Sequence, residues 1–187
     1  MPRRRKLLLV AVGVFAALVA VGVLTGGDDP VEDPRPVAEG CLPVERTTPV
    51  PKGGLHKAGT IQYAEAPPNS GEHAPNTLRN AKRFYSRDDN PPAEQAVHDL
   101  EHGLVVAWYD DELPDDQVAL LEEVSQGVGS RYVAVPWRRS VFPGGRHFVL
   151  TAWGKTQRCD RVSPEAIRQF VEDHADSKDA PEAGYSV

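Results

Sequence analysis

The chain of 187 residues lacks several features that would place it in a familiar class of protein. It has only two cysteines and no CxxC pair, so no spacing supports a thiolate metal site. It has a single long hydrophobic run, which excludes a membrane protein with several spans. Hydrophobic residues still make up 40% of the chain, which excludes a wholly disordered protein.

Positive charge is also scarce. The sequence has 21 Lys and Arg against 27 Asp and Glu, a net charge of -6, and four of the basic residues lie within positions 1–6. A nucleic-acid-binding protein needs a basic surface to displace counterions from phosphates. We therefore expect no nucleic-acid partner.

The one long hydrophobic run, Leu7–Leu24 (LLLVAVGVFAALVAVGVL), contains neither a charge nor a proline. A helix over this run would extend about 27 Å, close to the hydrocarbon thickness of a bilayer. The basic residues at positions 1–6 favour a cytoplasmic N-terminus. We expect a single-pass signal anchor in the cell membrane with an extracytoplasmic C-terminal domain. The alternative is a cleaved signal peptide, which would also export the domain.

The exported part divides into three segments by composition. Residues 25–40 are acidic and rich in proline and glycine, which predicts an extended tether. Residues 41–174 are expected to form one globular domain, and residues 175–187 a disordered tail. Cys41 and Cys159 lie near the two ends of the domain, and an isolated pair outside the cytoplasm tends to oxidise. We expect a Cys41–Cys159 disulfide; the alternative is a thiolate pair that holds a soft metal.

The hydrophobic pattern predicts an α+β fold, with a small mixed β-sheet and two or three packed helices behind the transmembrane helix. A strand, a helix and a second strand in succession predict a parallel pair, and the FPGGR turn predicts a third strand antiparallel to its neighbour. The predicted strands are Leu104–Tyr109, Tyr132–Val135 and His147–Trp153, with a possible strand at Thr60–Tyr63. The predicted helices are Pro91–Gly103, Pro114–Gln126 and Pro164–His174.

The first predicted helix carries an unusual polar face. Glu94, His98, Glu101 and His102 share one side within about 100°, opposite an apolar stripe. Two histidines one turn apart can aim their imidazoles at one metal ion. Glu101 lies between them and can serve as a ligand, as a partner that orients a ligand, or as a base. The alternative is a solvated polar face.

The same residues also match a catalytic motif. His98-Asp99-Leu100-Glu101-His102 has the H-x-x-E-H spacing of inverted zinc proteases, in which the glutamate deprotonates water. That motif usually lies in mid-helix, whereas here Gly103 follows at once. A zinc-dependent hydrolase with Glu101 as general base is therefore a second hypothesis.

A third histidine lies in the turn Pro67–His73 (PPNSGEH), where proline, serine and glycine favour a rigid loop. If this turn folds back so that His73 meets His98 and His102, the three nitrogens complete a metal site. The alternative is a structural loop in which His73 bonds to the backbone. The remaining histidines are assigned no ligand role: His147 at a strand start, His56 in a loop and His174 at a helix end.

Three motifs together resemble a known family. PPNSGEH (Pro67–His73), VHDLEHG (Val97–Gly103) and LTAWGK (Leu150–Lys155) are similar to a bacterial membrane-anchored family catalogued as domain of unknown function 3105. The resemblance runs from about Cys41 to Glu172 and implies a membrane-anchored exported domain with no established activity or ligand. Its polar signature falls on the following residues: Ser70, Gly71, His73, His98, Glu101, His102 and Gly103.

The pattern favours a domain that binds a divalent transition metal through His73, His98, Glu101 and His102. Borderline nitrogen ligands suit zinc or copper. The alternatives are the hydrolase and a structural or protein-interaction module in which the same residues form a hydrogen-bond network. The sequence does not specify a protein partner.

Overall fold

A computed structural model describes residues 37–78 and 82–185. The basic tip, the predicted signal anchor Leu7–Leu24 and most of the predicted tether lie outside these residues. Within the residues that the structure describes, no helix has the length and apolar character needed to cross a bilayer.

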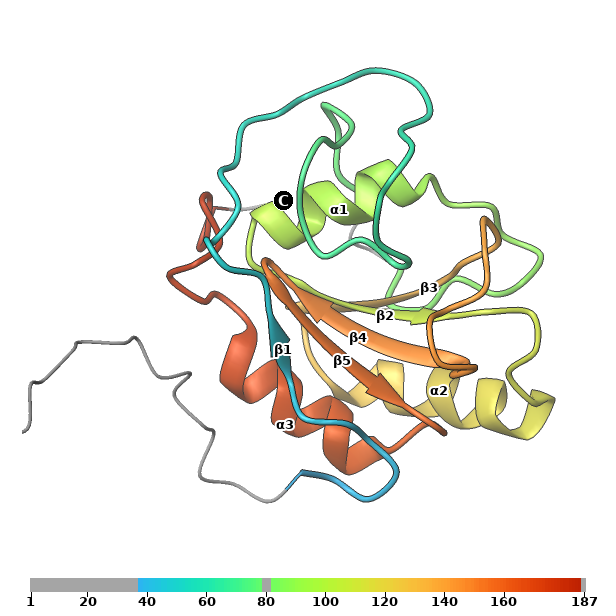
Figure 1. Ribbon diagram of the computed structural model, residues 1–187. Helices are drawn as coiled ribbons and strands as arrows, with labels where there is room; N and C mark the ends of the chain where they lie inside the picture. The colour runs from blue at the N-terminus through green and yellow to red at the C-terminus, as the bar shows by residue number, and fades with distance from the viewer. Residues whose placement is uncertain (1–36, 79–81, 186–187) are drawn as a thin grey trace, which may run out of the picture. The chain divides into compact units, whose positions relative to one another are not determined.

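The domain is a five-stranded mixed sheet with three helices (Figure 1), so the predicted α+β class is confirmed. The strands lie in the order β1-β5-β4-β2-β3. In chain order the elements are β1 Glu45–Arg46, α1 Ala93–Glu101, β2 Val105–Tyr109, α2 Asp115–Gly127, β3 Tyr132–Pro136, β4 Phe148–Ala152, β5 Lys155–Cys159 and α3 Pro164–His174.

The central pairings follow the predicted topology. Strands β2 and β3 are parallel neighbours connected through α2, and β4 runs antiparallel to β2. The predicted strand at Thr60–Tyr63 is wrong. The Ile61 N–H donates to the Glu94 carboxylate at 2.8 Å, and the Ile61 carbonyl accepts from Arg139 at 3.0 Å. Side chains thus satisfy this backbone in place of a neighbouring strand.

Both faces of the sheet are covered. Alternate residues of β2 belong to two separate cores: Val105, Ala107 and Tyr109 pack with α2 and α3, and Val106 and Trp108 pack with α1. Figure 1 shows α1 on one face of the sheet and α2 and α3 on the other. Burial on both faces explains why these strands read as continuous apolar runs rather than alternating ones.

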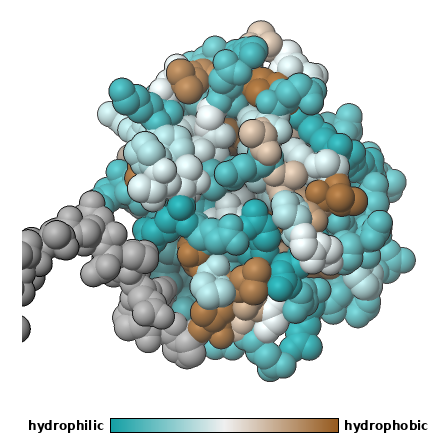
Figure 2. All heavy atoms as spheres, viewed as in Figure 1, coloured by the Kyte–Doolittle hydropathy of each residue, from teal (hydrophilic) through white to brown (hydrophobic). Residues whose placement is uncertain are grey.

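The surface in the view of Figure 2 is mostly hydrophilic, and its hydrophobic residues form small separate patches. The large hydrophobic residues exposed within the described ranges are Val37, Leu42, Val50, Leu55, Val141 and Tyr185. A face of this kind lacks the contiguous apolar area that marks many protein interfaces.

The first residues of the domain are covalently linked to β5. Cys41 and Cys159 form a disulfide, as the sequence predicted. Backbone hydrogen bonds flank it on both sides, from Leu42 N to Arg158 O at 2.8 Å and from Asp160 N to Gly40 O at 2.7 Å. The cross-link therefore joins two segments that are already paired in the folded state.

The segment after α3 differs from the disordered tail that the sequence predicted. Residues 176–185 form turns, with Ala180 buried. The Lys155 ammonium donates to Ser177 Oγ at 3.2 Å and to Asp179, and Glu182 N donates to the Glu101 carbonyl at 3.0 Å. Hydrogen bonds, rather than an apolar stripe, hold this segment. Its composition therefore resembles that of a disordered terminus.

Candidate metal centre

The polar side of α1 faces the protein interior. Glu94, His98 and Glu101 are all buried, so the alternative of a solvated polar face is wrong. Figure 1 shows the reason: the long loop before α1 arches over the helix and covers this side. Buried charged groups need compensating partners, so each of these residues must be matched by a specific neighbour.

Glu94 is matched by a structural ion pair. Arg139 Nη2 donates to both Glu94 carboxylate oxygens at 2.7 Å, and Ile61 N donates to one of them. Burial by itself would raise the Glu94 pKa, but these donors outweigh burial and hold the pKa below its usual value. Glu94 therefore secures the loop to α1 and has no free oxygen for a ligand.

The PPNSGEH loop is anchored on the β4–β5 hairpin. The Asn69 amide donates to Thr47 Oγ1 and Thr156 Oγ1, both at 3.0 Å, while Gly154 N donates to the Asn69 carbonyl at 3.0 Å. Gly71 has a φ of +106°, a conformation that glycine adopts without strain. The loop thereby carries His73 from the hairpin back to α1.

His73 is fixed in one orientation. Its side chain is fully buried, and Nδ1 lies 2.8 Å from the Gly71 carbonyl. Because a carbonyl only accepts, Nδ1 carries a proton, and the neutral tautomer that this contact selects has its lone pair at Nε2. The ring also packs edge-on against Trp153, whose indole N–H donates to Pro51 O at 2.8 Å. Trp153 of the TAWG motif therefore supports both His73 and the covering loop.

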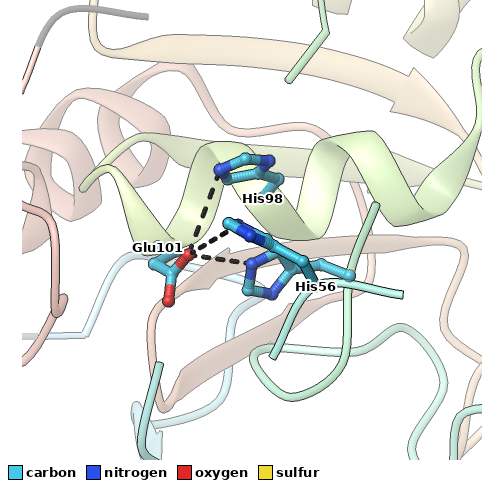
Figure 3. A group of neighbouring side chains, drawn as sticks. His56, His98 and Glu101 are labelled. Carbon is cyan, nitrogen blue, oxygen red and sulfur yellow. Dashed lines mark ion pairs between the residues drawn. The ribbon is translucent and has the colours of Figure 1, made fainter. Parts of the chain in front are cut away.

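Three imidazoles and one carboxylate converge at this point. The ring centroids of His56, His73 and His98 lie 4.8 to 4.9 Å apart. Glu101 Oε2 lies 2.8 Å from His73 Nε2, 3.8 Å from His56 Nε2 and 4.0 Å from His98 Nε2 (Figure 3). Ligand atoms around a tetrahedral zinc ion are about 3.3 Å apart when the bonds are about 2.0 Å. The structure brings His73 to His98 but not to the whole expected pair of His98 and His102, and the spacing suits one ion.

The contact between His73 and Glu101 has an unusual geometry. Although His73 Nε2 and Glu101 Oε2 lie 2.8 Å apart, neither has a hydrogen-bond partner among the described residues, and both side chains are fully buried. Buried polar atoms without partners are costly. The other oxygen, Oε1, accepts from Gly54 N, which fixes the carboxylate. A cation bound by both His73 Nε2 and Glu101 Oε2 would give each of these two oriented atoms the partner that it lacks.

Sequence reasoning missed His56. Two backbone hydrogen bonds pair its strand-like segment with His73, from Lys57 N to His73 O at 2.7 Å and from His73 N to Leu55 O at 3.1 Å. The His56 side chain is 43% exposed, so it forms the solvent side of the cluster. The only signal in the sequence is a histidine after a Gly-Gly pair, which by itself predicts a loop.

His102 lies outside this four-residue cluster. Its Nε2 is 3.1 Å from His98 Nε2 and 3.4 Å from Glu182 Oε2, and these three residues form a second group. His102 follows the last residue of α1 and is directed toward the segment after α3. The predicted set of His73, His98, Glu101 and His102 is thus divided between two adjacent groups that share His98.

The surroundings of His98 favour its neutral form. Burial lowers its pKa, and the nearby imidazoles of His73, His102 and His56 lower it further, with only partial opposition from Glu101. A metal ligand must be a neutral imidazole. The electrostatics therefore keep this ring ready to coordinate at neutral pH.

The two other histidines, His147 and His174, lie elsewhere in the fold. His147 Nδ1 lies 3.0 Å from Asp110 Oδ2 at the start of β4, and His174 packs edge-on against Phe170 in α3. Neither belongs to a described group that could hold a metal ion.

Replacing Gly53 with alanine is expected to loosen the covering loop. A Cβ at this position would overlap Glu101 Oε1 and lie 2.5 Å from Pro181 Cγ. We expect a loss of about 1–3 kcal/mol in the free energy of unfolding, measured by thermal or denaturant melts. Gly127→Ala is the control, because a Cβ there meets nothing within 4 Å. A Gly53→Ala chain as stable as wild type would contradict the described packing.

Comparison with known proteins gives a family but no activity. A family model described as "Protein of unknown function (DUF3105)" matches residues 55–187, a range that begins just before His56 and contains both His/Glu groups. No curated protein and no solved structure matches the chain. The resemblance inferred from the three motifs is therefore confirmed: the chain belongs to the DUF3105 family of proteins of unknown function.

Proposed function

We propose that this chain is a membrane-tethered, extracytoplasmic domain that binds a divalent transition metal through His56, His73, His98 and Glu101. The observation that carries the proposal is the buried pair of His73 Nε2 and Glu101 Oε2, which face each other at 2.8 Å without a hydrogen bond. A cation between these atoms and the two other imidazoles would satisfy all four groups at once.

The donor set narrows the choice of metal. Three imidazole nitrogens and one carboxylate oxygen are borderline ligands that suit zinc or copper. The Nδ1–Gly71 hydrogen bond of His73 is of the kind that orients metal-binding histidines. His56, on the solvent side, gives the centre a route of access.

The proposed location rests on other features of the chain. The hydrophobic run Leu7–Leu24 and the preceding basic residues support a single-pass anchor with a cytoplasmic N-terminus. The Cys41–Cys159 disulfide supports an oxidising compartment for the domain. Labelling of intact cells with a membrane-impermeant reagent tests this placement, and a domain protected from the reagent would contradict it.

The geometry favours a ligand role for Glu101 over the role of a general base. Its Oε2 lies among the imidazole nitrogens, whereas a base would act on a metal-bound water. Glu101→Gln separates the two roles. Loss of the metal indicates a ligand, and a retained metal with loss of a hydrolytic activity indicates a base.

The test is metal binding by the full-length chain. After treatment with a chelator, the wild type is titrated with Zn²⁺ and with Cu²⁺, and its metal content is measured by elemental analysis. We expect His73→Ala to weaken binding by about 100-fold or more. His147→Ala is the matched control, because His147 pairs with Asp110 outside the cluster, and it should bind metal as the wild type does.

A wild type that contains no metal and ignores both ions would overturn the proposal. The structural module would then be the better explanation, with the His73–Glu101 contact tying the PPNSGEH loop to α1. In that case His73→Ala should lower the melting temperature equally with and without chelator.

A further inference from the structure

The second histidine group lies beside the proposed metal centre and exposes a carboxylate to solvent. It consists of His98, His102 and Glu182, whose ligand atoms lie within 4.8 Å of one another. The His102 and Glu182 side chains are 12% and 39% exposed, whereas in the inner cluster His56 is 43% exposed and His73 and Glu101 are fully buried. An ion that arrives from solvent therefore meets an exposed carboxylate at the outer group, whereas the carboxylate of the inner cluster is buried behind His56.

The outer group is held in place by the backbone around it. Glu182 N donates to the Glu101 carbonyl at 3.0 Å, which positions the Glu182 carboxylate beside the end of α1. Arg131 donates to the His102 carbonyl. The approach of Glu182 to His102 at 3.4 Å thus follows from fixed main-chain contacts.

The two groups share one atom. His98 Nε2 lies 3.1 Å from His102 Nε2 in the outer group and 4.0 Å from Glu101 Oε2 in the inner cluster. One imidazole nitrogen has one lone pair and can bind one ion at a time. The two positions are therefore alternatives, and the pair of groups is not a two-metal centre.

The buried His98 ring lies between the two groups, with the imidazoles of His56, His73 and His102 around it at centroid distances of 4.8 to 4.9 Å. Its other nitrogen, Nδ1, is buried and has no hydrogen-bond partner among the residues that the structure describes. His73, by contrast, is pinned through Nδ1 to Gly71. His98 therefore meets its polar neighbours through Nε2, which faces His102 on one side and Glu101 on the other.

We propose that His98, His102 and Glu182 form a loading position, which captures the divalent metal from solvent and transfers it to the inner cluster through His98. This inference rests on the proposed metal-binding function. The carboxylate of Glu182 attracts the cation, His102 and His98 bind it, and His98, whose Nε2 faces both groups, passes it to His73 and Glu101. The direction of transfer follows from the larger number of ligands in the inner cluster.

The test is the rate of metal uptake by the full-length, metal-free chain. Co²⁺ is mixed with the protein in a stopped-flow instrument, and its visible absorption reports coordination. For Glu182→Gln and His102→Gln we expect uptake to slow by about tenfold or more, the scale on which local charge changes association rates. Release should slow as well, so that the dissociation constant changes little.

Glu112→Gln is the matched control, because Glu112 is another exposed carboxylate near a histidine, 3.9 Å from His147 Nε2. Variants that load as fast as wild type would overturn the inference while leaving the metal centre intact. A weakening of affinity by about 100-fold at an unchanged uptake rate would also overturn it, because His102 or Glu182 would then be a permanent ligand. A wild type that binds neither Co²⁺ nor Zn²⁺ would instead refute the proposed function itself.

Discussion

Reduction of the Cys41–Cys159 disulfide is expected to lower the melting temperature of the domain by roughly 10–20 °C. The bridge joins residues 118 positions apart. Closing a loop of that length removes unfolded-state entropy that corresponds to about 5 kcal/mol in the chain-entropy model. Domains have total stabilities of about 5–15 kcal/mol, so one bond of this kind supplies a large share.

Two forms of the chain distinguish the effect of the cross-link on stability from the effect of packing the sulfur atoms. Wild type with a reductant loses the cross-link but keeps both side chains, whereas Cys41→Ala with Cys159→Ala also leaves a small space at the buried Cys159. We expect both to melt well below the oxidised protein, with the double variant slightly lower. Equal melting temperatures for the reduced and oxidised wild type would refute the expectation.

The helices and the central strands were predictable from local pattern. Helix α3 has the predicted bounds because its signals are local: Ser163 Oγ accepts from Ala166 N at 3.2 Å, and Pro164 occupies the first turn. Strands β2 and β4 read as apolar runs because both of their faces are buried. In each case the signals that predict the element lie within the element or directly beside it.

Strand β5 was not predicted, because its burial depends on distant residues. Its sequence, KTQRC, is polar. Lys155 is buried against Asp179, and Thr156 accepts from the Asn69 amide. Polar residues can fill an inner strand when partners from far along the chain satisfy them, and no periodicity within five residues reveals those partners.

The residues of the candidate site likewise fall into those that local pattern predicts and those that it does not. His98 and Glu101 share a helix and were predicted from spacing, and His73 was predicted from a motif that frames it in a rigid turn. His56 and Glu182 come from a loop and from the segment after α3, where no pattern marks them. Their contribution arises only when the fold brings separate segments over α1.

The same helix contains a buried carboxyl group that the metal centre does not use. Asp99 is fully buried, and no side chain within the described ranges hydrogen-bonds to its carboxylate. Burial raises its pKa to about 8, and the Leu78 backbone and the Arg131 charge offset only part of this effect. Asp99 is therefore protonated in the folded chain at neutral pH but ionised in the unfolded chain.

Because its pKa is higher in the folded chain than in the unfolded chain, Asp99 lowers the stability of the fold as pH rises. Between the unfolded value of about 3.8 and the folded value of about 8, the folded chain holds the extra proton, so the free energy of unfolding falls with increasing pH. The loss accumulates to a few kcal/mol, on the order of 1.4 kcal/mol for each pKa unit of difference, and stops growing above about pH 8.

Asp99→Asn is expected to remove this loss, because the amide does not ionise and has nearly the same shape. The variant should melt at about the wild-type temperature near pH 4 and roughly 10 °C higher near pH 8. The measurement is a series of thermal melts from pH 4 to pH 9 on the chelator-treated chain. All six histidines stay in both proteins, so their titration contributes to both series and the difference isolates Asp99. A constant difference across this range would mean that Asp99 is ionised in the folded protein.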